Sequence, residues 1–256
     1  MNKVWWLLAI CWPLTAAAQM QLVADSQAQA VFAGSTQIVR VVLHNAGDAP
    51  ASRDVDMRLV QLTAASAVSI GDARPWKKID LLPRQTVLET MAVAFPEVRA
   101  ATGFGVELVG IGRVRVTAWP HDVLQRLKTL AGDVPLGVFD PNGQLKTLLK
   151  QASVAMADFE IEPTDSKLAI VWSNGRNLPE SVKSRVTKGM SAVWIRSSTV
   201  PTSYAVRIGA GVIVVAPEST IRGLADSPLP QLTLIRDAEL ALQPEALRLP
   251  SDNQTE

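Results

Sequence analysis

Cysteine is almost absent from this chain of 256 residues, because its single copy, Cys11, lies in the N-terminal stretch MNKVWWLLAICWPLTAAAQ. This stretch has the order of a secretory signal peptide: a charged start, an apolar core and small residues before a cleavage point after Ala18. Pro13 interrupts the apolar run, which is shorter than the roughly 20 residues that a membrane span needs. We therefore expect residues 1–18 to be removed, and the mature chain to be periplasmic or secreted with no membrane insertion.

Loss of this segment would leave no thiol in the mature chain, which excludes disulfides, cysteine nucleophiles and cysteine metal sites. Histidine is nearly as scarce, since His44 and His121 are the only two. A Ser-His-Asp hydrolase needs a histidine placed as a base, and transition-metal sites are built mainly from histidine and cysteine. We expect no metal site and no cofactor.

An excess of either charge is also missing. The chain has 25 basic and 24 acidic residues, and removal of Lys3 with the signal segment would make the two numbers equal. Nucleic acids and anionic membranes require a basic surface, so neither is an expected partner.

The first part of the mature chain, residues 19–119, is typical of short β-strands. Apolar residues alternate with polar ones in VDMRLVQLT, with a slip at Val60, and again in GRVRVTAW, and the runs are separated by Gly, Pro, Asn and Asp. Strands in this rhythm predict an all-β sandwich. The stretches VRVVLHNAGDAPA and LLPRQTVLETMAV resemble the immunoglobulin-like modules of bacterial exported proteins, and this resemblance implies a binding or spacing role.

The following residues, 120–134, predict a connecting helix. Val123, Leu124, Leu127 and Leu130 share one face, and Gly132 is placed to end the helix.

Strand and helix patterns alternate from residue 135 to 246, which predicts a small α/β domain with a mostly parallel sheet. Residues 247–256 read as a polar tail. The expected strands are residues 136–139, 157–162, 167–172, 191–197, 211–217 and 230–240, and the expected helices are residues 143–154, 178–190 and 218–227. A flavodoxin-like or Rossmann-like form fits this order. In RIGAGVIVV the glycines precede a strand, which indicates a turn or bulge and not a dinucleotide fingerprint.

Two loops follow strands of this domain and are the candidate binding site. Ligands of open α/β sheets bind beyond the carboxyl ends of the strands, and neighbouring strands would bring the two loops together across a crevice. The candidate residues are Asp140, Asn142 and Gly143 in the first loop, and Ser173, Asn174 and Gly175 in the second.

These loops resemble motifs of haloacid-dehalogenase-type phosphatases. The resemblance implies Asp140 as nucleophile and Ser173 as phosphate ligand in a metal-assisted hydrolase. Asn142 stands where that family has its acid–base aspartate, however, and an amide has no proton to exchange. Where that family has a pair of acidic residues that bind magnesium, this chain has only Glu218.

A structural role explains the same residues. Asp-Pro-Asn-Gly favours a turn, because Asp and Asn bond their own backbone and Gly accepts a left-handed conformation. Either Asp140 or Asn142 is also suited to cap the following helix. The Ser173-Asn174-Gly175 loop has the same turn and capping chemistry.

The α/β part also resembles a degenerate class I glutamine amidotransferase-like domain. The likeness lies in VPLGVFDPNGQLKTLL and in KLAIVWSNGRNLPESVKSRVTKGMSAVWIRSS, a strand, loop, helix and strand in succession. Active members use a cysteine and a histidine that this domain does not contain, so the resemblance implies the fold without the activity.

The sequence therefore predicts an exported protein that is not an enzyme. Its expected role is to bind an envelope protein, through an edge of the sandwich or through the α/β crevice. The phosphate hydrolase of Asp140 and Ser173 and a small-ligand receptor in the same crevice are the alternatives.

Overall fold

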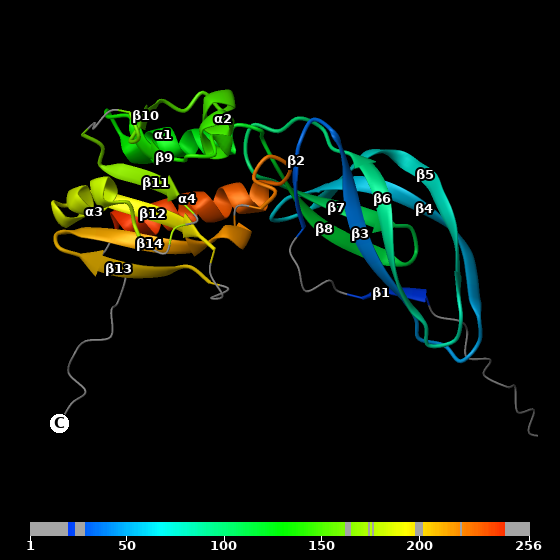
Figure 1. Cartoon of the computed structure of the whole chain (residues 1–256). Coiled ribbons are helices and arrows are strands. Elements are labelled where there is room, and N and C mark those ends of the chain that lie inside the picture. The colour runs from blue at the N-terminus through cyan, green and yellow to red at the C-terminus, as the bar shows by residue number, and fades with distance from the viewer. Residues whose placement is uncertain are drawn as a thin grey trace, which may run out of the picture. The chain divides into compact units, whose positions relative to one another are not determined.

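The computed structural model describes residues 20–23, 29–161, 165–173, 175, 177–197, 202–220 and 222–243 (Figure 1). The proposed signal segment, Asn174 and the polar tail lie outside this part of the chain. By their internal contacts the residues form two compact units. The first unit contains the described residues of the ranges 1–29, 36–95 and 102–117, and the second contains those of the ranges 30–35, 96–101 and 118–256.

The first unit is built from strands in two sheets, and the pairs β1–β3, β3–β6, β4–β5 and β4–β7 are antiparallel. One sheet has the order β1-β3-β6, with β1 Met20–Val23, β3 Thr36–Asn45 and β6 Thr86–Ala94. The other sheet has the order β2-β8-β7-β4-β5, with β2 Gln29–Phe32, β8 Gly112–Trp119, β7 Thr102–Leu108, β4 Ala51–Leu62 and β5 Ala67–Leu81. Residues 30–32 of β2 and residues 118–119 of β8 belong by their contacts to the second unit. A β-rich first part is therefore confirmed.

Alternating residues of both sheets form the core of this unit. Phe95, just after β6, packs edge-on against Phe104 of β7 with 5.6 Å between the ring centroids, so the two sheets touch. The slip at Val60 is also present: Leu59 and Val60 are both buried, and the pairing of β4 with β5 is irregular beside them. Strands β1, β2 and β5 are too irregular in hydrophobic pattern to have been predicted.

Asn45 explains how the first predicted turn is held. Its amide nitrogen donates to the carbonyl oxygens of Ala49 at 2.8 Å and Leu82 at 3.0 Å, while its amide oxygen accepts the N–H of Gly47 at 3.0 Å. The side chain is fully buried, and these bonds satisfy backbone groups that would otherwise be orphaned.

The second unit has one six-stranded sheet of order β10-β9-β11-β12-β14-β13. Its strands are β9 Leu136–Phe139, β10 Met156–Asp158, β11 Leu168–Trp172, β12 Ser191–Arg196, β13 Tyr204–Ile208 and β14 Gly211–Pro217. All pairs are parallel except β13 with β14. β9 is the first strand of this sheet along the chain. The next strand, β10, lies on one side of β9, and the following strand, β11, lies on the other side. The direction in which strands are added therefore reverses between β9 and β11.

Helices cover both faces of this sheet. One face packs against apolar residues of α1 Arg126–Ala131, α2 Gln144–Gln151 and α4 Pro228–Leu242, and the other against α3 Glu180–Thr187. Successive residues of one strand serve opposite cores: Ile170 faces the first group of helices and Val171 faces α3. This double burial explains why the strands read as continuous apolar runs. The α/β character of the second part is confirmed.

The predicted strand at residues 230–240 is wrong, because this segment belongs to helix α4. Ser227 accepts the N–H of Leu229 at the N-cap, and Pro228 occupies the first helical position, which favours a helix start. Buried residues then recur with helical spacing at Leu234, Ile235, Ala238 and Ala241. The local β-propensity of LTLI was outweighed by this capping and by burial against the sheet.

Other differences are smaller. The expected helix at 218–227 is only a short 3-10 turn, η2 Glu218–Thr220, followed by further turns, and the expected strand at 157–162 is confined to β10. The antiparallel strand β13 was not predicted. The connecting helix is present as η1 Val123–Gln125 and α1, which ends at Gly132 with φ of 75° as expected.

Helix α4 buries a carboxyl group, Asp237, which is only 1% exposed. Burial raises the pKa of Asp237, although a hydrogen bond from Ser203 and the charge of Arg236 partly oppose the shift. Between the ordinary pKa of aspartate and this raised value the folded state holds the proton more tightly, so the free energy of unfolding falls as the pH rises.

We expect Asp237→Asn to remove this pH-dependent loss. The melting temperature at pH 7 should rise by about 2–4 °C, the effect of about 1 kcal/mol in a domain of this size. The advantage should shrink as the pH is lowered below the ordinary pKa of aspartate, where both states are protonated. Thermal melts against pH would measure this, with exposed Asp133→Asn as control. A variant that is no more stable than the parent at pH 7 would contradict the expectation.

Candidate functional site

Asp140 lies where β9 ends, and its carboxyl group holds the start of helix α2. Its Oδ2 accepts the backbone N–H groups of Leu145 at 2.7 Å and Lys146 at 3.2 Å, while its own carbonyl oxygen accepts the N–H of Gly143. Gly143 has φ of 71°, the left-handed conformation expected of this turn. The predicted turn and cap are thus confirmed for Asp140, whereas Asn142 is exposed and makes no cap.

A cluster of three charged side chains, Lys146, Asp158 and Glu160, also holds the loop that contains Asp140. Lys146 Nζ lies 2.8 Å from Asp158 and 3.0 Å from Glu160, and Glu160 also accepts the backbone N–H of Asp140. Burial alone would lower the pKa of Lys146, but the hydrogen bonds and charges of Asp158 and Glu160 outweigh it and raise the pKa. The lysine stays charged, so it acts here as a fixed cation that joins α2 to the last residue of β10 and to Glu160 beyond it.

The second candidate loop follows β11, the parallel neighbour of β9. The two strands are therefore adjacent, as the crevice required. The Ser173 hydroxyl oxygen accepts the indole N–H of Trp194 at 3.0 Å, and the Ser173 backbone N–H donates to Ile195. Gly175 is exposed, and Asn174 lies outside the described residues.

Asp140 and Ser173 both make structural hydrogen bonds. Asp140 is 1% exposed, and neither Asp140 nor Ser173 is among the residues that line the cavity beside these loops. Within the described part of the chain, no three His, Asp or Glu side chains are grouped closely enough to hold a metal ion.

The histidines are also engaged locally. Nδ1 of His44 lies 2.9 Å from the hydroxyl oxygen of Thr86, and the ring of His121 stacks on Phe32 with 4.8 Å between centroids.

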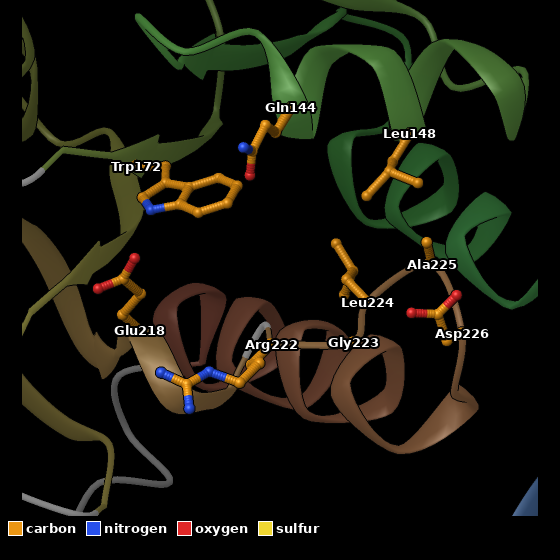
Figure 2. A pocket seen from close by; sticks show the side chains of 9 residues that line it. All are labelled: Gln144, Leu148, Trp172, Glu218, Arg222, Gly223, Leu224, Ala225 and Asp226. Atoms are coloured by element: carbon orange, nitrogen blue, oxygen red, sulfur yellow. The ribbon is translucent and has the colours of Figure 1, made fainter.

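A cavity of about 320 Å³ nevertheless opens at the carboxyl edge of the sheet, beside these loops (Figure 2). Its lining residues come from the start of α2, the end of β11 and the segment after β14, and they are Gln144, Leu148, Trp172, Glu218, Arg222, Gly223, Leu224, Ala225 and Asp226. The edge is the one that the sequence indicated, since ligands of such sheets bind where the winding reverses.

Figure 2 shows a polar end and an apolar end of this cavity. The indole of Trp172 lies between Gln144 and Glu218, with Arg222 nearby, while Leu148, Leu224 and Ala225 form the other end. The sequence pointed to Glu218 only as a possible magnesium ligand and to Trp172 only as a packing residue, and the other lining residues were not predicted. The available signal was position: Gln144 opens the predicted helix and Trp172 ends a predicted strand.

The first unit exposes a second surface of interest, on the outer face of the sheet β1-β3-β6. Val23 of β1 pairs with Val42 of β3, which pairs with Leu88 of β6, so three apolar side chains cross the three strands in one row. Ile38, further along β3, is exposed on the same face. We call these four residues the apolar row.

Comparisons with known proteins give no family. No family model matches the sequence, and no curated protein matches it. Among the described residues, no helix combines the length and apolar character that crossing a membrane requires.

Solved structures show only low similarity. A β-glucosidase from Listeria innocua has a TM-score of 0.31 at 14% identity over 40% of this chain and 16% of its own. An alkylpurine DNA glycosylase from Pseudomonas fluorescens has a TM-score of 0.28 at 13% identity, with 40% and 31% covered. A sporulation control protein from Bacillus subtilis has a TM-score of 0.26 at 13% identity, with 44% and 56% covered. This chain thus spans about a sixth of the glucosidase. TM-scores this low indicate neither a shared fold nor a shared activity.

Proposed function

We propose that this chain is an exported, non-catalytic interaction protein of the cell envelope, and that the apolar row contacts its partner protein. The observation that carries the proposal is the exposure of the row. Leu88 is 63% exposed and Ile38 is 61% exposed, although both lie in the middle of paired strands. Isolated exposed apolar residues are common, but contiguous ones mark protein contact surfaces.

The chemistry of the row favours an apolar partner surface. Arg40 is the one charged side chain between Ile38 and Val42 on the outward side of β3. A partner that presents apolar side chains would match this surface in hydrophobicity.

The accompanying expectations form part of the same proposal. They are the immunoglobulin-like description of the first unit, the flavodoxin-like or amidotransferase-like description of the second, and export through the signal segment. The reversal of winding between β9 and β11 supports the flavodoxin-like description. The structural use of Asp140 and Ser173 supports a role without catalysis.

Crosslinking capture from envelope extract tests the proposal, with the tagged full chain as bait. We expect one saturable protein partner, which Leu88→Glu loses because a carboxylate would be desolvated at the contact. Leu82→Glu is the matched control, since Leu82 is 65% exposed in the turn after β5 and lies outside the row. Absence of a saturable partner, or a partner lost equally by both variants, would refute the proposal.

A small-ligand receptor is the second candidate function, and the cavity of about 320 Å³ favours it. Ligand pockets have volumes of about 300–1,000 Å³, so this cavity suits a compact molecule. The phosphate hydrolase remains testable beside it. Magnesium-dependent turnover of a phosphate ester, abolished by Asp140→Asn, would overturn the non-catalytic proposal.

A further inference from the structure

The cavity at the carboxyl edge contains polar groups that have no partner among the residues that the structure describes. The indole nitrogen of Trp172 is buried and makes no hydrogen bond, which is costly for a donor removed from water. Arg222, Glu218 and Asp226 form no ion pairs with described residues, although all three border the same cavity. A ligand with complementary groups would satisfy them together.

A phosphate group does not fit this site. In sheets of this kind, phosphates bind the free N–H groups at the N-terminus of the first helix. Here the Asp140 carboxylate already accepts the N–H groups of Leu145 and Lys146 at the start of α2. Glu218 and Asp226 add two further negative charges, which repel a phosphate dianion more strongly than the single carboxylate of a ligand that also carries a positive charge.

Arg222 and Glu218, which lie at the Trp172 end of the cavity in Figure 2, match the two charges of a zwitterion. Arg222, the Trp172 N–H and the Gln144 amide can donate to a carboxylate, while Glu218 can pair with an ammonium group. The indole face of Trp172 adds cation–π attraction for that ammonium group.

The rest of the cavity defines the ligand's other end. Leu148, Leu224 and Ala225 lie away from Glu218 and Arg222 in Figure 2, and Asp226 lies beside Ala225. An aliphatic side chain would bury its apolar surface there, and the small volume limits its length.

We propose that this cavity binds a small α-amino acid with an aliphatic side chain. The carboxylate would lie toward Arg222, the ammonium group toward Glu218, and the side chain against Leu148 and Leu224. This inference rests on the second candidate function, that of a small-ligand receptor.

Calorimetric titration of the full protein tests the proposal with probes that differ by one group. Leucine carries both charges, leucine amide lacks the carboxylate, and 4-methylpentanoate lacks the ammonium group. Glucose and inorganic phosphate represent other ligand classes, and the dipeptide leucyl-leucine distinguishes a free amino acid from a peptide end. We expect leucine to bind more tightly than any of the others. Tighter binding of glucose, phosphate or the dipeptide, or no binding at millimolar concentration, would overturn the proposal.

Two variants assign the charges. Arg222→Gln should lower the affinity for leucine by about 10- to 100-fold, the worth of a charged hydrogen bond, and leave leucine amide unchanged. Glu218→Gln should weaken leucine and leucine amide alike. Arg207→Gln, an exposed arginine on β13, is the matched control. Equal affinities in all variants would refute the proposed contacts, whereas the partner capture described above tests the apolar row independently.

Discussion

Gly211→Ala is expected to destabilise the second unit by more than about 3 kcal/mol, which places it among the severe single substitutions. A Cβ atom at Gly211 would lie less than 3.0 Å from the carbonyl oxygens of Met190 and Val186. Both are backbone atoms at the end of α3 and before β12, so neither can rotate away. The helix would have to move off the sheet, and the packing of Val182 and Val186 against β14 would be lost.

Urea unfolding followed by tryptophan fluorescence would measure this loss. Gly103→Ala is the matched control, because a Cβ there would meet Leu62 only at 3.6 Å, an ordinary contact. Its unfolding free energy should stay within about 1 kcal/mol of the parent. Similar stabilities of the two variants would show that the close approach at Gly211 can relax and would contradict the prediction.

Asp140→Ala is expected to cost about 2–4 kcal/mol, because it removes a buried helix cap and leaves two backbone N–H groups without an acceptor. Asp140→Asn should cost less, since the amide oxygen can still accept from Leu145. Asn142→Ala, two residues away and exposed, should change the unfolding free energy by less than about 0.5 kcal/mol. Urea unfolding of the three variants would measure these differences.

The same series separates the structural role of Asp140 from a catalytic one. A structural carboxylate predicts graded stability losses with no phosphatase activity in the parent. A nucleophile predicts parent activity that Asp140→Asn abolishes while the fold remains stable. Because α2 supplies Gln144 and Leu148 to the cavity, Asp140→Ala should also weaken any ligand bound there.

Local signals were strong enough to predict most of the second unit. The strands around Val138, Ile170 and Val193 are buried on both faces, and such strands read as apolar runs whatever their neighbours. The Asp-Pro-Asn-Gly turn was equally clear, because its residue types satisfy the backbone within a few positions.

Prediction failed where long-range packing decided the outcome. Residues 230–240 have strand-like composition but form a helix, since burial against β12 and β14 favours the helical face of Leu234 and Ala238. Strand β13 has a weak pattern of its own and is defined by antiparallel pairing with β14. Neither effect can be read from a short window of sequence.

For the candidate site, the sequence by itself determined which reactive residue types are scarce and which edge of the sheet to search. It has no cysteine outside residues 1–18 and only two histidines, and it marks the loops after two parallel strands. Only the tertiary structure decided that Asp140 and Ser173 turn inward to hold the fold, while Trp172, Glu218 and Arg222 gather around a cavity. The physical reason is that hydrogen-bond partners and cavities depend on segments far apart in the chain, which only folding brings together.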